Sequence, residues 1–536
     1  MAEHLLLGDE ALALGAIDAG ISGAYAYPGT PSTEITEFLM RSEEHRSGNL
    51  SVAWTTNEKT ALEAALGMSY AGKRAMASMK HVGLNVAADP FINGAIAGAN
   101  GGLVVAVADD PSMHSSQNEQ DSRLYTDIAL VPCIEPADQQ EAYDAAVYAF
   151  DLSERLRVPI LVRLTTRLAH SRGLVVRRKQ RAQNTIDPPE DTTRYILLPA
   201  TARESYADLV RRQEGFVRES EESPFNSLHP GEDTTLGIIA SGIAYSYLLD
   251  VTGGSPRNPV LKIGQYPLPL GLIDELLESC ERILVLEEGY PYIETRLRGI
   301  PTRKAPEIRG RLTGDLPRTG ELTPGAVASA AGIDRTSVRP DSDLPVPRPP
   351  ALCPGCPHAD TCRALNEALA DRPEGRVFSD IGCYTLAALP PYEAIDTCVE
   401  MGGSITMAKG ASTAGLRPAV ALIGDSTFTH SGMTGLLDCV NERTDITVVI
   451  VDNLTVAMTG GQESAARNRI ESICAGLGIE PEHIRVIEPL PQNHERNVAI
   501  IRAEIDHPGP SVIIARRECV QTAARRARKV QRKGEG

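Results

Sequence analysis

Two apolar runs decide the fold: PAVALIGDS at residues 418–426 and ITVVIVDN at residues 446–453. Both are rich in β-branched residues and bounded by turn residues, which is typical of buried parallel strands. Asp425 follows the first run directly, and Asn453 ends the second. Because parallel strands bind ligands at their shared carboxyl edge, we expect the two side chains to lie close together.

This edge has the composition of a site for a hard cation. The Asp425 carboxylate, the Asn453 amide oxygen and a main-chain carbonyl near Thr455 could give Mg²⁺ three protein oxygens. Gly424 and Ser426 lie in the turn, where backbone amides can approach a phosphate group closely. A Gly-Asp turn after a strand is also a common helix start without any ligand, so GDS alone leaves both interpretations open.

The α/β pattern recurs along the chain. Helical stretches alternate with short apolar runs such as GGLVVAVADD, which predicts three doubly wound α/β units. The predicted boundaries are a first α/β domain at 1–190, a polar connecting segment at 191–234, a smaller middle α/β domain at 235–334, a Pro-rich linker at 335–350, a third α/β domain at 351–522 and a basic tail at 523–536. For the tail, a frayed terminus and an anion-docking element are both considered.

Composition excludes several classes of function. The 536 residues carry a formal net charge of -17 at pH 7, which predicts an acidic, multidomain globular protein and argues against a nucleic-acid partner. The N-terminus lacks the pattern of a signal peptide, and no uncharged apolar run reaches about 18 residues. We therefore expect no membrane span and a cytoplasmic protein.

Four cysteines are candidates for a shared centre. Cys353 and Cys356 have CxxC spacing in CPGCPH, Cys383 follows in IGCYTLAALPP, and Cys519 ends IIARREC. Four thiolates suit a tetrahedral zinc ion or a four-iron cluster, and four ordinary buried thiols are a third interpretation. The remaining cysteines are interpreted as packing residues: Cys133, Cys280, Cys362, Cys398, Cys439 and Cys474.

The spacing around the two strands resembles a known family. Gly-Asp-Ser, then 26 residues, then Asn is similar to the thiamine-diphosphate fingerprint. The flanking segments DSTFTHSGMTGLLD and VDNLTVAMTGGQ resemble the large subunit of the indolepyruvate branch of the 2-oxoacid:ferredoxin oxidoreductases. The resemblance implies that residues 1–190 bind the pyrimidine of thiamine diphosphate and that residues 351–522 bind its diphosphate with Mg²⁺. We also place Gly403 and Ser404 among the cofactor-binding residues.

The resemblance also implies an activating carboxylate and a dimer. The segment AWTTNEKTALEAALGMSYAGKR is similar to the family stretch that carries the glutamate which hydrogen-bonds the aminopyrimidine, and it assigns that role to Glu58. Without the resemblance, Glu58 would be interpreted as a surface acid near a helix start. In the family these two thiamine-binding domains meet across a subunit interface, so self-association is expected.

Three further runs of residues resemble the family's substrate face: YPGTPST at 27–33, MKHVGLNVAADP at 79–90 and DDPSMHSSQNEQDSR at 109–123. Hydroxyls and a cation could hold an oxoacid carboxylate, and an imidazole could transfer protons. The candidates are Thr30 and Ser32, the catalytic pair Lys80 and His81, and the loop residues Gln117, Asn118, Gln120, Asp121 and Arg123. Solvated loop residues are the alternative interpretation of the last group.

By resemblance, the four cysteines are expected to hold one 4Fe-4S cluster, because passing electrons singly to ferredoxin requires a one-electron carrier, which zinc is not. The implied reaction is oxidative decarboxylation of an aryl or other 2-oxoacid, such as indolepyruvate, with coenzyme A capturing the acyl group and a smaller subunit completing the enzyme. The family usually carries a C-terminal ferredoxin-like domain with two CxxCxxCxxxCP runs, and this sequence contains neither run, so we expect that domain to be lacking and leave the electron acceptor open. A non-oxidative thiamine-dependent decarboxylase or lyase and a catalytically silent scaffold are the alternative functions.

Overall fold

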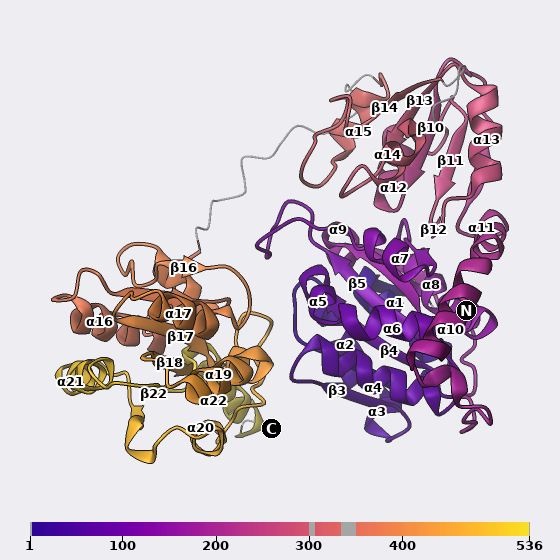
Figure 1. The fold of residues 1–536 in the computed structure, drawn as a ribbon. Helices are drawn as coiled ribbons and strands as arrows, with labels where there is room; N and C mark the ends of the chain where they lie inside the picture. Colours follow the sequence, from indigo (N-terminus) through magenta and orange to yellow (C-terminus); the bar gives the residue numbers. More distant parts are fainter. Residues whose placement is uncertain (1–2, 300–305, 334–349, 535–536) are drawn as a thin grey trace. The chain divides into compact units, whose positions relative to one another are not determined.

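The computed structural model describes residues 3–299, 306–333 and 350–534 (Figure 1). The chain forms two compact units, 1–341 and 342–536, and each is described by itself. The predicted linker at 335–350 lies outside the described residues, except for Pro350. Among the described residues, none of the helices combines the length and the apolar composition needed to cross a membrane.

The first unit is built on a seven-stranded sheet with the order β12-β6-β7-β5-β4-β2-β3. All neighbours are parallel except β12, which runs antiparallel to β6. The apolar runs of β4 and β5 are buried almost throughout, as expected for central parallel strands. The strands are β2 (Gly23–Ala26), β3 (Ser51–Trp54), β4 (Ala75–Lys80), β5 (Leu103–Asp109), β6 (Cys133–Ile134), β7 (Ile160–Thr165) and β12 (Gln265–Tyr266).

Helices connect and cover these strands, and a separate ribbon of β1 (Glu3–Leu7) and β8 (Arg172–Val176) runs antiparallel. Helix α1 packs along α8, and α4 packs on β4 and α6. The helices are α1 (Gly8–Asp18), α2 (Thr33–Arg41), α3 (Glu43–Arg46), α4 (Glu58–Tyr70), α5 (His81–Val86), α6 (Ala88–Ala97), α7 (Arg123–Ala129), α8 (Gln139–Leu156) and α9 (Thr166–His170).

The middle part of unit 1 forms a second sheet with the order β14-β13-β10-β11-β9, parallel except for β9. Its elements are β9 (Ser227–His229), β10 (Gly237–Ser241), α12 (Ile243–Val251), β11 (Val260–Ile263), α13 (Leu270–Ser279), β13 (Arg282–Leu286), α14 (Tyr292–Arg298), β14 (Glu307–Arg309) and α15 (Pro324–Ala330). Strand β12 belongs to this stretch of sequence but extends the first sheet. The segment that builds the second sheet therefore also contributes one strand to the first.

The segment 191–234, predicted as a polar connection, contains more structure than expected. It forms a short 3₁₀ turn at Thr193–Tyr195 and the helices α10 (Pro199–Arg211) and α11 (Gln213–Glu221). Leu209 and Phe216 are buried at 2% exposure each, because single apolar residues on these mostly polar helices reach the core of unit 1. Few apolar anchors are enough to hold a helix whose other faces are solvated.

The second unit contains a six-stranded sheet with the order β16-β15-β17-β18-β22-β21, parallel throughout. The strands are β15 (Arg376–Ser379), β16 (Thr397–Cys398), β17 (Ala419–Gly424), β18 (Thr447–Asp452), β21 (Ile484–Ile487) and β22 (Ser511–Arg516), with a hairpin of β19 (Thr455–Val456) and β20 (Gln462–Glu463). The helices are α16 (Pro357–Leu369), α17 (Gly403–Thr413), α18 (Asp425–Thr427), a π-helical turn at Phe428–Gly432, α19 (Met433–Glu442), α20 (Ile470–Leu477), α21 (His494–Ile505) and α22 (Val520–Gly534).

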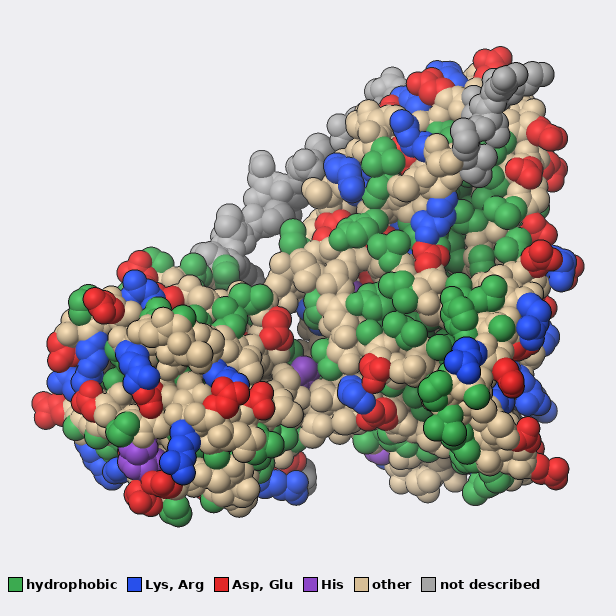
Figure 2. Space-filling model, in the orientation of Figure 1, with side chains coloured by type: hydrophobic (Ala, Val, Ile, Leu, Met, Phe, Trp, Pro, Cys, Tyr) green, Lys and Arg blue, Asp and Glu red, His purple; other side chains and the backbone are tan. Residues whose placement is uncertain are grey.

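The three main sheets confirm the predicted α/β class. Helix α22 covers most of the predicted basic tail, which is therefore helical over Val520–Gly534 rather than frayed. On the face that Figure 2 presents, acidic and basic side chains are interspersed and do not gather into one basic patch.

Candidate functional site

Asp425 and Asn453 follow neighbouring strands of the second sheet. Strands β17 and β18 are parallel, and their register pairs Gly424 with Val451, so Asp425 and Asn453 emerge at the same carboxyl edge. Asp425 is 3% exposed, and its Oδ2 atom is buried with no hydrogen-bond partner in the described part of the chain. Burial, followed by the nearby charge of Asp452, raises the pKa of Asp425 to about 7. A buried carboxylate oxygen of this kind is suited to bind a cation.

The Asn453 side chain is fixed by its neighbours. Its Oδ1 accepts a hydrogen bond from the Thr455 amide at 3.1 Å, and its Nδ2 lies 3.1 Å from Nε2 of His358. Burial lowers the pKa of His358 to about 4, so the imidazole is neutral near pH 7 and can accept from the Asn453 amide. The Thr455 hydroxyl donates to the Gln462 carbonyl at 2.8 Å, which ties the loop after β18 to β20.

Gly403 and Ser404 begin helix α17 beside a second acid at the strand ends. The Ser404 hydroxyl donates to Oδ2 of Asp380 at 2.6 Å, and the Tyr384 hydroxyl donates to Oδ1 of the same carboxylate. Burial raises the pKa of Asp380 to about 7. Sequence reasoning missed Asp380 and His358. Asp380 directly follows the strand RVFS, so the same strand-then-acid pattern that indicated Asp425 could have indicated it.

The turn after β17 is closely packed. Ser426 donates a hydrogen bond to Oγ of Ser464 at 3.2 Å. A Cβ atom at Gly424 would lie 2.8 Å from the ring of Tyr384, so the close approach of that ring requires glycine at this position.

All four predicted cysteines line one cavity of about 220 Å³, together with Asn453 and His358. Each of them is a free thiol. Burial and the proximity of Cys356, Cys519 and Cys353 raise the pKa of Cys383 to about 12. The Cys519 amide donates to the Asn453 carbonyl at 3.2 Å, so the cysteine cavity adjoins the strand end that carries Asn453.

In unit 1, the predicted catalytic residues gather at the carboxyl ends of β3, β2 and β4. Glu58 starts helix α4 after β3 and is 4% exposed. A Cβ atom at Gly83 would lie 2.5 Å from Oε1 of Glu58, so this glycine lets the carboxylate reach the turn after Lys80 and His81. The Lys80 side chain also packs against Gly29, one residue before Thr30. A Cβ atom at Gly29 would lie 3.1 Å from the Lys80 side chain.

The loop after β5 joins the same edge through its backbone. The Lys80 ammonium donates to the Ser115 carbonyl at 2.8 Å, and the Ser115 hydroxyl donates to the Thr30 carbonyl at 3.2 Å. Nε2 of His81 lies 3.2 Å from the Asn118 carbonyl. Burial lowers the pKa of Lys80 to about 8. Lys80, His81, Glu58 and the Thr30 turn are therefore brought together.

The remaining predicted substrate residues differ in whether their side chains are free to contact a substrate. Gln117 and Asn118 are exposed, and Gln120 is half-buried. Ser32 is 2% exposed and donates its hydroxyl hydrogen to the Gly29 carbonyl at 2.7 Å, so it closes its own turn.

Arg123 is the prediction that the structure does not support. Its side chain is fully buried and forms ion pairs with Asp121 at 2.5 Å and with Glu287 at 3.1 Å. It also donates to the Tyr266 hydroxyl at 3.0 Å. Glu287 and Tyr266 come from the middle of the chain, whose position relative to β5 the sequence pattern does not reveal. We interpret Arg123 and Asp121 as structural residues.

The comparisons with known proteins cover both units. The family "Pyruvate flavodoxin/ferredoxin oxidoreductase, thiamine diP-bdg" matches residues 14–209, and "Thiamine pyrophosphate enzyme, C-terminal TPP binding domain" matches residues 380–515. The "Indolepyruvate oxidoreductase subunit IorA" of Archaeoglobus fulgidus is 39% identical over 96% of this chain and 86% of the relative. The proteins of the same name from Pyrococcus abyssi and Methanothermobacter thermautotrophicus are each 38% identical over 96% of this chain, and 85% and 86% of their own lengths are covered.

Proposed function

The chain belongs to the family of the indolepyruvate oxidoreductase subunit IorA, and from this premise we propose that it oxidatively decarboxylates an aryl 2-oxoacid, such as indolepyruvate. This membership confirms the family resemblance found in the sequence. The chain is a thiamine-diphosphate-dependent 2-oxoacid oxidoreductase subunit, and a partner subunit completes the enzyme. The single observation that supports the proposal is the cavity lined by both Asn453 and the four cysteines, because the proposed diphosphate site would then adjoin the proposed redox centre.

The diphosphate and Mg²⁺ would be held at the ends of β17 and β18. The Asp425 carboxylate has a buried oxygen that no described residue hydrogen-bonds, and the Asn453 oxygen is oriented by the Thr455 amide. With a main-chain carbonyl near Thr455, these atoms are the hard oxygen donors that Mg²⁺ prefers. Gly403 and Ser404 at the start of α17, with Gly424 and Ser426, would offer backbone amides and hydroxyls to the diphosphate.

Glu58 is the residue that we propose activates the cofactor. When bound, thiamine diphosphate supplies a carbanion that adds to the oxoacid carbonyl and stabilises the charge left by decarboxylation. The role of Glu58 is to hydrogen-bond the aminopyrimidine ring through a carboxyl group that is 4% exposed and therefore shielded from water. Self-association of the chain is part of the proposal.

Lys80 and His81 would handle the substrate. Lys80 is held beside the Thr30 turn, and its ammonium would attract the oxoacid carboxylate. The His81 ring, positioned by the Asn118 carbonyl, would transfer protons near the reacting atoms. Thr30, Gln117, Asn118 and Gln120 are the polar groups from which the substrate site would be completed.

The cysteine cavity is proposed to hold a 4Fe-4S cluster rather than zinc. Cys353, Cys356, Cys383 and Cys519 line one cavity, so all four thiols are available to a shared centre. Reducing ferredoxin needs a centre that passes electrons singly, which an iron–sulfur cluster can do and zinc cannot. Ferredoxin as acceptor and coenzyme A as acyl acceptor belong to the proposal.

The test is anaerobic co-expression with a candidate small subunit. Oxidation of indolepyruvate and phenylpyruvate is followed with a viologen dye, with and without coenzyme A. We expect dye reduction that requires the oxoacid, thiamine diphosphate and coenzyme A together. Release of the aldehyde without dye reduction would instead indicate the non-oxidative decarboxylase, and cofactor binding without either product would indicate a scaffold.

A further inference from the structure

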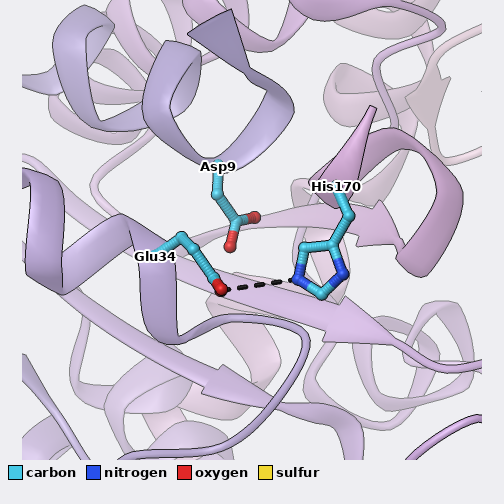
Figure 3. Close-up of side chains that lie close together, drawn as sticks. All are labelled: Asp9, Glu34 and His170. Atoms are coloured by element: carbon cyan, nitrogen blue, oxygen red, sulfur yellow. Dashed lines mark ion pairs between the residues drawn. The ribbon is translucent and has the colours of Figure 1, made fainter. Parts of the chain in front are cut away.

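A cluster of three potential metal ligands lies in the first unit, apart from the residues assigned to catalysis. It consists of Asp9 at the start of α1, Glu34 at the start of α2 and His170 at the end of α9. One ligand atom from each residue lies within 4.8 Å of the other two. In Figure 3 the Asp9 carboxylate points toward the other two side chains.

The strand register explains why Asp9 and His170 meet. The antiparallel pair β1–β8 places Leu7 opposite Arg172, so Asp9 and His170 lie two residues beyond the pair on each chain segment. Gly8 lets α1 approach closely, because a Cβ atom there would collide with the Leu168 carbonyl of α9. Helix α2 packs on α1 and brings Glu34 to the same point.

Asp9 is the unusual member of the cluster. It is 0% exposed, and both of its carboxylate oxygens are buried without a hydrogen-bond partner among the residues that the structure describes. Burial, followed by the charges of Glu34 and Glu10, raises its pKa well above the ordinary value. A buried carboxylate in such surroundings needs a proton or a cation.

The neighbouring basic groups do not supply that cation. Among the described residues, the ion pairs of Arg41 are with Glu10 at 3.8 Å and Glu37 at 4.0 Å, and none joins Asp9 to Lys or Arg. The basic side chain within the cluster is His170, whose Nε2 lies 3.4 Å from Oε2 of Glu34. Two ligand atoms of a tetrahedral ion at about 2.0–2.1 Å are roughly 3.3 Å apart, so this pair already has a suitable spacing.

We propose that Asp9, Glu34 and His170 bind one Zn²⁺ ion that ties the starts of α1 and α2 to the end of α9. One imidazole and two carboxylates are a donor set that zinc accepts, and the fourth position would be left to water. The partial exposure of His170 (34%) and Glu34 (35%) gives the ion a path of entry, while Asp9 supplies the buried ligand. Because Glu34 follows the Thr30–Ser32 turn closely in sequence, the ion would also fix the start of the helix after that turn.

The test measures zinc content rather than activity. Full-length protein is stripped with a chelator, equilibrated with Zn²⁺ and freed of loose metal by gel filtration. We expect the wild type to retain about one zinc ion per chain more than Asp9→Asn or His170→Gln. The cysteine site contributes equally to all three proteins, so the difference reports this cluster alone. Zn²⁺ should also raise the melting temperature of the wild type more than that of either variant.

His494→Gln is the matched control. His494 pairs with Glu367 at 2.8 Å at comparable exposure (31%), but within the described part of the chain no third potential ligand lies close enough to join the pair. We expect this variant to retain as much zinc as the wild type. Equal zinc in Asp9→Asn, His170→Gln and the wild type would overturn the proposal and assign a bound proton to Asp9 instead. If Asp9→Asn does not fold, the partly exposed His170→Gln variant decides the question.

Discussion

Asp425 and Asn453 follow adjacent parallel strands and lie one and two residues beyond the last paired positions, Gly424 and Val451. Neighbouring strands are about 4.8 Å apart, so groups from the two tips can ligate one ion. The two side chains differ in what surrounds them. The Asn453 oxygen is oriented by a backbone amide, whereas Oδ2 of Asp425 has no hydrogen-bond partner among the described residues. Of these two residues, the negatively charged one, Asp425, is therefore the one whose oxygen can bind a cation.

Asp425→Asn tests this relationship directly. The substitution keeps the shape but removes the charge, so we expect thiamine diphosphate to bind at least about 100-fold more weakly in the presence of Mg²⁺, a loss of roughly 2.7 kcal/mol. The affinity is measured by calorimetry. Asp438→Asn, at an exposed position on α19, is the control and should bind normally. Affinity within about twofold of the wild type in Asp425→Asn would remove the assigned role.

Glu58→Gln should separate cofactor binding from activation. Glutamine retains the size of the side chain but cannot supply the carboxyl group, so we expect turnover to fall about 100-fold or more with little change in thiamine diphosphate affinity. Steady-state rates and calorimetry are compared for the two proteins. Glu63→Gln, an exposed acid on the same helix, should behave as wild type. Near-normal turnover in Glu58→Gln contradicts the assignment.

Cys356→Ala should lower the iron content of anaerobically purified protein. It removes one of four sulfur ligands from the cavity, and we expect the brown colour and the bound iron to decrease together. Cys280→Ala is the matched control, because both cysteines are 8% exposed and Cys280 lies in the first unit. Full iron retention in Cys356→Ala would place the cluster elsewhere or exclude it.

The sequence predicted the strand-end residues well, because a buried parallel strand is a short apolar run whose end can be read directly. Asp425 and Asn453 each follow such a run, whereas Lys80 was assigned from the resemblance of its segment to the family. The cysteines were predicted to converge, and Cys353, Cys356, Cys383 and Cys519 do line one cavity. These inferences need only local pattern and the common carboxyl edge of parallel strands.

What the sequence could not reveal are pairings between distant segments. Arg123 was expected to meet substrate, but its partner Glu287 is 164 residues further along the chain. Similarly, β12 adds to the first sheet although its sequence lies among the elements of the second. Whether a charged side chain is buried depends on which distant segment packs over it, and the local sequence pattern does not predict this packing.

Arg123→Met tests the structural role now assigned to this arginine. Removing the guanidinium leaves Glu287 buried without its cation and leaves Asp121 with only the more distant Arg163 at 3.6 Å, so we expect the free energy of unfolding to fall by about 3–5 kcal/mol. Urea denaturation followed by circular dichroism measures the change. Arg155→Met, which removes an exposed pair with Glu219, should cost only about 0–1 kcal/mol. A small effect for Arg123→Met would return this residue to the list of substrate ligands.

We expect the rate of the reaction to depend on pH around the pKa of Lys80. Burial lowers its pKa to about 8, so the ammonium form that would attract the oxoacid carboxylate is lost as the pH rises through that value. We expect kcat/KM to be level below about pH 8 and to fall roughly tenfold per pH unit above it.

The profile is measured from about pH 7 to about pH 10 in the wild type and in two variants. Lys80→Arg keeps its positive charge over this range, because a guanidinium titrates above about pH 12, so the decline should disappear even if the overall rate is lower. Lys80→Met lacks the cation at every pH, and its profile should be flat and at least about tenfold lower. A wild-type profile without a decline, or the same decline in Lys80→Arg, would show that another group controls the rate. The difference between the lysine and arginine profiles thus isolates the charge of residue 80 from all other titrating groups in the enzyme.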